Sequence, residues 1–114
     1  MKILIIDDEP LDLFVAKRLL SLEFEVEGFT TLDEALAWAR ENSFDVALID
    51  YYITPTVLAH DALKALRQIN GDGFKAFTLS NYVDQQQVNA LRTSGFNDVI
   101  FKPLTLENFK ERIR

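Results

Sequence analysis

Five polar side chains stand at the ends of apolar runs, and their types suit the chemistry of phosphate groups. Asp7 and Asp8 follow the first run, Asp50 and Ser80 follow two later runs, and Lys102 follows the last. Carboxylates held close together repel one another unless a cation joins them, and Mg²⁺ prefers a few carboxylates with water and phosphate oxygens. An aspartate nucleophile, a metal, a hydroxyl and an ammonium group together indicate phosphoryl transfer.

The runs that carry these residues have the pattern of buried strands. Continuous, largely apolar segments at 3–6, 46–49, 76–79 and 99–101 are typical of strands covered on both faces of a parallel sheet. Around Phe24 and Val26, glutamates alternate with apolar residues, which predicts a half-exposed strand at a sheet edge.

Apolar residues at helical spacing separate the predicted strands. The first helix is predicted to present a mostly apolar stripe made of Leu11, Phe14, Val15, Arg18, Leu19 and Leu22. A second stripe is made of Leu32, Ala35, Leu36 and Ala39. Thr31 and Glu34 form a capping-box pattern, Gly95 is placed to end a helix, and Thr105 to begin one. Strands that alternate with helices predict a parallel sheet with helices on both faces.

The carboxyl ends of the strands are where these elements would position the polar residues. In an open α/β sheet, ligands bind at that edge, where the order of the strands reverses. In the strand order 2-1-3-4-5 this point lies between the first and third strands, which Asp7, Asp8 and Asp50 follow. We therefore expect the three acids, Ser80 and Lys102 to surround one crevice.

Four segments in this order carry a resemblance to a known family: IIDDEP at 5–10, ALID at 47–50, FTLS at 77–80 and FKP at 101–103. Over essentially its full length the chain resembles the receiver domains of bacterial response regulators, in particular chemotaxis regulators. The resemblance implies an α/β, flavodoxin-like fold: a five-stranded parallel sheet of order 2-1-3-4-5, flanked by helices. It also implies one receiver domain spanning residues 1–114.

The resemblance assigns a metal site that includes the phosphoacceptor. By position, Asp50 is expected to accept the phosphoryl group and, with Asp8, to bind the metal directly. Asp7 is expected to act through water, and the backbone carbonyl of Tyr52 to be a further ligand. The implied cofactor is Mg²⁺, with Mn²⁺ as an alternative.

The resemblance also assigns Ser80 as the switch hydroxyl and Lys102 as the invariant lysine. Thr78 is the rival hydroxyl, but it lies two residues earlier, inside the predicted strand. The bond between Lys102 and Pro103 is expected to be cis, which X-Pro bonds permit at modest cost.

Several positions depart from the family pattern. Pro55 comes one residue late after the phosphoacceptor, and Ala59 and His60 stand where glycine is usual, so the intervening loop is expected to be remodelled. Val99 replaces the aromatic switch residue, and Asn81 replaces a common alanine.

Tyr52 and Tyr82 occupy positions that tune loss of the phosphoryl group in this family. They stand two residues after Asp50 and Ser80. We hypothesise that their rings shield the acyl phosphate from water and lengthen its life.

The implied function is phosphorylation-dependent signalling in a two-component system. A phosphohistidine on a sensor histidine kinase or phosphotransfer protein would donate to Asp50 and switch a surface that binds a partner or a second copy. The domain would assist its own phosphorylation and dephosphorylation without being a turnover enzyme. The alternative is a receiver-like interaction module that takes no phosphate, which the altered loop and Val99 favour.

Two other classes fit less well. A flavodoxin-like FMN protein would need a loop rich in Ser, Thr or Gly after the first strand, where acids stand instead. A haloacid-dehalogenase-like phosphatase would space its acids Asp-x-Asp, whereas Asp7 and Asp8 are adjacent.

The composition of the chain limits its cellular compartment and its partners. The absence of cysteine excludes disulfides and thiolate sites and is compatible with a cytoplasmic location. A net charge of −6 argues against direct nucleic-acid binding, and no apolar run reaches the roughly 20 residues of a membrane helix. The start at Met1 favours an N-terminal or stand-alone receiver.

Overall fold

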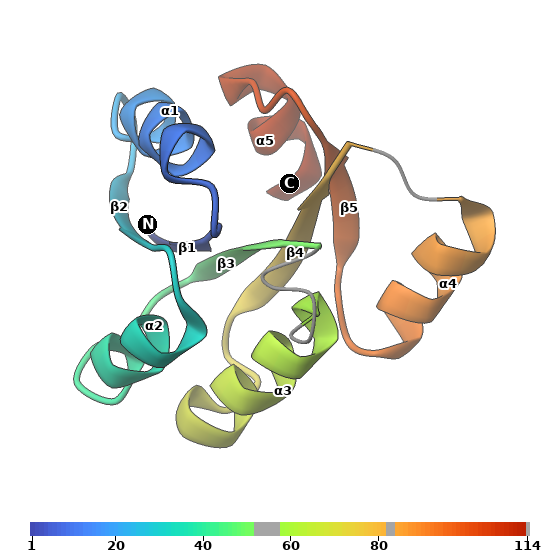
Figure 1. The fold of residues 1–114 in the computed structure, drawn as a ribbon, viewed down its shortest axis with the longest axis horizontal. Coiled ribbons are helices and arrows are strands. Elements are labelled where there is room, and N and C mark those ends of the chain that lie inside the picture. Colours follow the sequence, from blue (N-terminus) through green and yellow to red (C-terminus); the bar gives the residue numbers. More distant parts are fainter. Residues whose placement is uncertain (52–57, 82–83, 114) are drawn as a thin grey trace.

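Five strands pair in parallel at the centre of the fold, in the order β2-β1-β3-β4-β5 (Figure 1). The computed structural model describes residues 1–51, 58–81 and 84–113. The strands are β1 (Lys2–Ile6), β2 (Glu25–Phe29), β3 (Val46–Asp50), β4 (Lys75–Ser80) and β5 (Asp98–Phe101). This confirms the predicted sheet, including its strand order.

A helix follows each strand along the chain. The helices are α1 (Pro10–Leu20), α2 (Leu32–Ala39), α3 (Ala59–Asn70), α4 (Gln85–Thr93) and α5 (Leu106–Ile113). In the described part of the chain, none of them is long and apolar enough to cross a lipid bilayer.

Both faces of the sheet are covered, which explains why its inner strands are apolar throughout. On β1, Ile3 and Ile5 pack in a cluster with residues of α1 and α5, while Leu4 and Ile6 pack in a second cluster with α2 and α3. Figure 1 shows α1 and α5 on one side of the sheet, and α2 and α3 on the other. Each fully buried aliphatic side chain contributes about 1.5–3 kcal/mol to folding.

The edge strand β2 is confirmed, although it begins two residues later than the glutamate-rich segment suggested. Glu25 on this strand is exposed and Val26 is half-buried. Charged side chains along an open edge discourage pairing with another chain.

The predicted apolar stripe of the first helix does not face the sheet. Four of its members are more than half exposed, namely Leu11 (66%), Phe14 (57%), Val15 (55%) and Leu22 (74%). The helix buries Leu13, Ala16 and Leu20 instead. Both sides of this segment are apolar at helical spacing, so the periodicity could not show which side faces the sheet.

The helix boundaries follow the predicted signals. The Thr31 hydroxyl accepts a hydrogen bond from the backbone N–H of Glu34 at 3.2 Å, and the Thr105 hydroxyl accepts one from Asn108 at 3.0 Å. Gly95, just beyond α4, has a φ of 110°, a conformation that favours glycine.

Candidate functional site

Three carboxylates meet at the carboxyl ends of β1 and β3. The strands pair in register from Ile3 with Val46 to Ile6 with Ile49, which places Asp7 beside Asp50. One oxygen from each of Asp7, Asp8 and Asp50 lies within 4.8 Å of the others. Asp7 is buried, with 1% of the residue exposed, while Asp8 is exposed. The predicted convergence of the three acids therefore holds in the fold.

Lys102 reaches the acids from the segment after β5. Its Nζ lies 3.1 Å from Oδ1 of Asp50 and 3.6 Å from Oδ2 of Asp7. Its backbone N–H donates to the carbonyl of Ser80 at 2.8 Å, which fixes the start of this segment against the end of β4. The peptide bond to Pro103 is cis, as expected.

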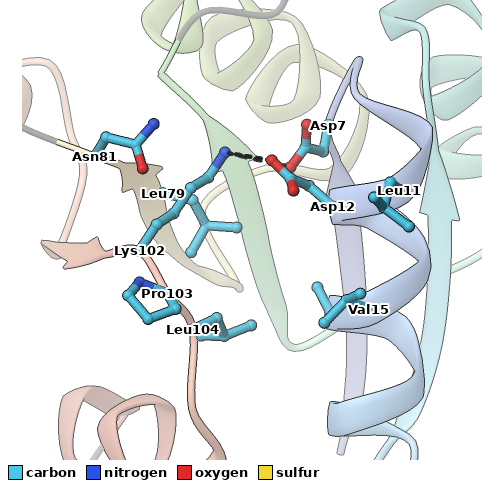
Figure 2. A pocket seen from close by; sticks show the side chains of 10 residues that line it. Asp7, Leu11, Asp12, Val15, Leu79, Asn81, Lys102, Pro103 and Leu104 are labelled. Carbon is cyan, nitrogen blue, oxygen red and sulfur yellow. Dashed lines mark hydrogen bonds and ion pairs between the residues drawn. The ribbon is translucent and has the colours of Figure 1, made fainter.

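The site also contains a fourth carboxylate, which was not predicted from the sequence. Asp12, in the first turn of α1, places its Oδ2 3.5 Å from Nζ of Lys102. Figure 2 shows Lys102 extending across the crevice toward Asp12 and Asp7. A signal was available, because Asp12 falls in the first turn of the helix that begins shortly after Asp7 and Asp8.

The electrostatics of the site show an excess of negative charge. Burial, followed by repulsion from Asp7, raises the pKa of Asp50 to about 6, although Lys102 opposes the shift. Burial also raises the pKa of Asp7, against a hydrogen bond from the N–H of Glu9 and attraction to Lys102. Burial lowers the pKa of Lys102, but the neighbouring carboxylates outweigh it and the pKa rises.

These carboxylates fit a hard divalent cation. Three carboxylate oxygens within 4.8 Å of one another face a single ammonium group, which leaves their negative charge only partly balanced. Mg²⁺ binds through a few carboxylates and keeps several waters, so Asp7, Asp8 and Asp50 could hold it.

Of the two candidate hydroxyls, Ser80 lies at the crevice and Thr78 is used elsewhere. Ser80 ends β4, and its partner in the strand register is Phe101, the neighbour of Lys102. The Thr78 side chain is fully buried and donates to the carbonyl of Ile49 at 2.8 Å. This geometry favours Ser80, as the sequence did.

A cavity of about 380 Å³ opens beside the acids, between α1 and the segment after β5. Its polar lining consists of Asp7, Asp12, Asn81 and Lys102 (Figure 2). Leu11 and Val15 belong to its apolar wall, so the exposed side of α1 continues into the site.

Only some of the positions that depart from the family pattern lie in the described part of the chain. Val99 is 2% exposed and packs in the core beside α3, so no aromatic ring occupies its position. His60 is exposed and lies 3.4 Å from Asp61 on α3. The expectations for Pro55, Tyr52 and Tyr82 fall on residues 52–57 and 82–83, outside the described part of the chain.

The sheet order, the helices on both faces and the acids with a lysine at the carboxyl edge define a receiver-type α/β domain. The chain belongs to the response regulator receiver domain family, whose model matches residues 3–114. Receiver domains act as phosphoacceptor switches, generally bind Mg²⁺, and interact with histidine kinases or phosphotransfer proteins. This membership sets aside the flavin-binding and dehalogenase-like alternatives.

Solved structures of receiver domains superpose on nearly the whole chain. A receiver domain protein from Clostridium thermocellum is 28% identical, with a TM-score of 0.85, over 98% of this chain and 90% of its own. A CheY-like receiver domain protein from Methanospirillum hungatei is 26% identical, with a TM-score of 0.83, over 98% and 89%. The chemotaxis protein CheY4 of Vibrio cholerae shares the fold at 24% identity, with a TM-score of 0.87, over 98% and 94%. Among curated proteins, none matches the chain significantly.

Proposed function

We propose that residues 1–114 form one receiver domain that accepts a phosphoryl group onto Asp50, in a reaction that requires Mg²⁺. The donor would be a phosphohistidine on a sensor histidine kinase or phosphotransfer protein in the cytoplasm. The observation that carries the proposal is the position of the Asp50 carboxylate, between the acids after β1 and the ammonium of Lys102 at 3.1 Å.

Asp50 is better placed than its neighbours to act as the nucleophile. Its side chain is 13% exposed, whereas that of Asp7 is 2% exposed, and it ends the strand at the middle of the sheet. A carboxylate oxygen would form a bond to phosphorus while the phosphorus–nitrogen bond of the donor breaks, and the imidazole would leave after taking up a proton. A pKa of about 6 leaves Asp50 mostly ionised at neutral pH, as attack requires.

The remaining polar groups would serve the phosphoryl oxygens. Lys102 supplies a mobile positive charge, and Ser80 supplies a hydroxyl donor at the end of β4. Asp7, Asp8 and Asp50, with the backbone carbonyl of Tyr52, would hold Mg²⁺ or Mn²⁺. When bound, the metal would neutralise charge on the transferring group.

The exposed side of α1 supports a protein donor. Leu11 and Val15 are more than half exposed and line the cavity that also includes Asp7. Large exposed apolar side chains grouped beside a site are typical of an interaction surface. A donor that buried them would bring its phosphohistidine to the acids.

Phosphorylation would act as a switch because it adds nearly two negative charges at one point. Ser80 and Lys102 would then rearrange, and an existing equilibrium involving α4 and β5 would shift toward the state that binds a partner or a second copy. Since Val99 is small and buried, this coupling would not use an aromatic rotamer at that position.

Mass spectrometry after incubation with acetyl phosphate and Mg²⁺ tests the proposal. We expect the parent to gain one phosphoryl group, about 80 Da. The gain should vanish in Asp50→Ala and without Mg²⁺, and should persist in Asp33→Ala, which removes an exposed acid on α2. No adduct on folded parent protein, with a phosphohistidine donor also tried, would favour the phosphate-independent interaction module.

The same measurement, followed over time after the donor is removed, examines the shielding role proposed for Tyr52 and Tyr82. The adduct should disappear faster in Tyr52→Asn and Tyr82→Glu than in the parent. Equal or slower loss would contradict a shielding role.

A further inference from the structure

Lys102 divides its ammonium group among three carboxylates that have different roles. The Nζ distances are 3.1 Å to Asp50, 3.5 Å to Asp12 and 3.6 Å to Asp7. An ammonium has three N–H donors; it donates to Asp50 and Asp12, and Asp7 lies at ion-pair distance. A phosphoryl group arriving at Asp50 would need some of those donors.

Asp12 differs from the other two because it lies outside the metal cluster. The acids whose oxygens gather within 4.8 Å are Asp7, Asp8 and Asp50. A bound cation would neutralise Asp7 and Asp50, and both would then attract Lys102 less strongly. The cation would also repel the ammonium group of Lys102. Asp12 would keep its charge and would attract Nζ toward α1.

The position of Asp12 allows it to compete with other groups for the ammonium of Lys102. It stands in the first turn of α1, with its side chain 52% exposed at the cavity wall, opposite Lys102 (Figure 2). The Lys102 side chain is 17% exposed. The pair is therefore partly open to water, and its effect should be modest and sensitive to salt.

We propose that Asp12 is a positioning residue that competes with the phosphoryl group for Lys102. By attracting Nζ toward α1 when the other acids hold a metal, it favours metal binding and slows phosphoryl capture. This inference rests on the proposed function, and it adds a residue that sets the balance between the two steps.

Asp12→Asn tests the proposal through two quantities that should move in opposite directions. Without Asp12, the ammonium should shift toward Asp50, so Mg²⁺ affinity measured by calorimetry should fall about 2–5-fold. The rate of phosphorylation by acetyl phosphate at saturating Mg²⁺ should rise about 2–5-fold, because Lys102 is released and one repelling charge is gone. A merely structural role would not produce opposite signs.

Two matched variants separate the ion pair from general charge effects. Asp33→Asn removes the same charge from the first turn of α2 and should match the parent in both measurements. Asp12→Glu keeps the charge beside Lys102 and should restore most of both values. If both quantities change in the same direction in Asp12→Asn, or if Asp33→Asn reproduces its effects, the proposal is wrong.

The Lys102→Met background shows whether Asp12 acts through the lysine. In that background Asp12→Asn should change Mg²⁺ affinity little more than Asp33→Asn does. An undiminished effect would overturn the proposal. If the parent binds Mg²⁺ but takes no phosphoryl group, the proposed function fails while the calorimetric cycle still decides the competition for Lys102. A parent that binds no Mg²⁺ contradicts both.

Discussion

The surroundings of Asp50 in the folded protein favour its protonated form more than water does. Burial and the neighbouring Asp7 raise its pKa to about 6, while an unfolded chain would leave it near 4. Without metal, the folded protein therefore binds this proton more tightly than the unfolded protein. The stability that results is fully present below about pH 4 and is lost as the pH rises through about 6.

In the absence of divalent cations, Asp50→Asn should be more stable than the parent at neutral pH. Because the substitution removes a carboxylate that is disfavoured when charged, the free energy of unfolding should rise by about 1–2 kcal/mol above pH 7. The gain should disappear toward pH 4, where Asp50 is already protonated. Urea unfolding between pH 4 and pH 8, in chelator, measures the difference.

Asp98→Asn provides a control of opposite sign. Burial raises the pKa of Asp98, but hydrogen bonds from the N–H of Val99, Arg92 and Arg112 lower it more, so the net shift is downward. Its carboxylate therefore contributes stability above about pH 4 that is lost at lower pH, and the variant should be destabilised at neutral pH. A destabilised Asp50→Asn at pH 8 would contradict the account of the site.

At the scale of elements, α1 has two apolar sides with different roles. Leu20 is fully buried against the sheet, whereas Leu11 is 66% exposed on the same helix. Leu20→Ala should lower the free energy of unfolding by about 2–4 kcal/mol, because it leaves a cavity in the core. Leu11→Ala should change it by no more than about 0.5 kcal/mol.

Chemical denaturation of the two variants measures this contrast directly. The substitution is the same in both cases, so differences in side-chain chemistry cancel. Equal losses would mean that Leu11 is buried too. Because Leu11 lines the cavity beside the acids, its replacement should instead slow transfer from a protein donor.

The strands were predictable because each leaves a local mark on the chain. Continuous apolar runs identified β1 and β3, and alternating glutamates identified the edge strand β2. The buried side of α1 was not predictable, because a segment with two apolar sides has no preferred orientation until the sheet exists. The resemblance to receiver domains, more than periodicity, supplied the strand order.

The same limit applies within the site. Asp7, Asp8, Asp50 and Lys102 follow strands, so topology alone predicted that they meet. The ion pair of Asp12 with Lys102 joins residues 90 positions apart and depends on the path of one flexible side chain. No local pattern encodes that path.

For the whole molecule, metal binding and folding should be linked. The three acids meet only in the folded sheet, so Mg²⁺ should bind the folded state much more tightly than the unfolded chain. At ten times its dissociation constant, Mg²⁺ should add about 1.4 kcal/mol of stability and raise the melting temperature by roughly 4–8 °C.

Thermal unfolding with Mg²⁺ and with NaCl of equal ionic strength separates binding from screening. Asp8→Asn should lose most of the increase, because it removes a cluster member, while Asp33→Asn should keep it. An increase of the same size in Asp8→Asn would place the ion elsewhere on the molecule.

The distribution of the site along the chain has a consequence for synthesis. Asp7 precedes Lys102 in the chain, and Lys102 follows the outermost strand β5. On the ribosome, the acids emerge long before the lysine that balances them. A chain released before residue 102 would carry every acid of the crevice and lack its ammonium group. Under the proposed function, premature termination should therefore yield fragments that lack Lys102 and do not compete with intact protein as phosphoryl acceptors.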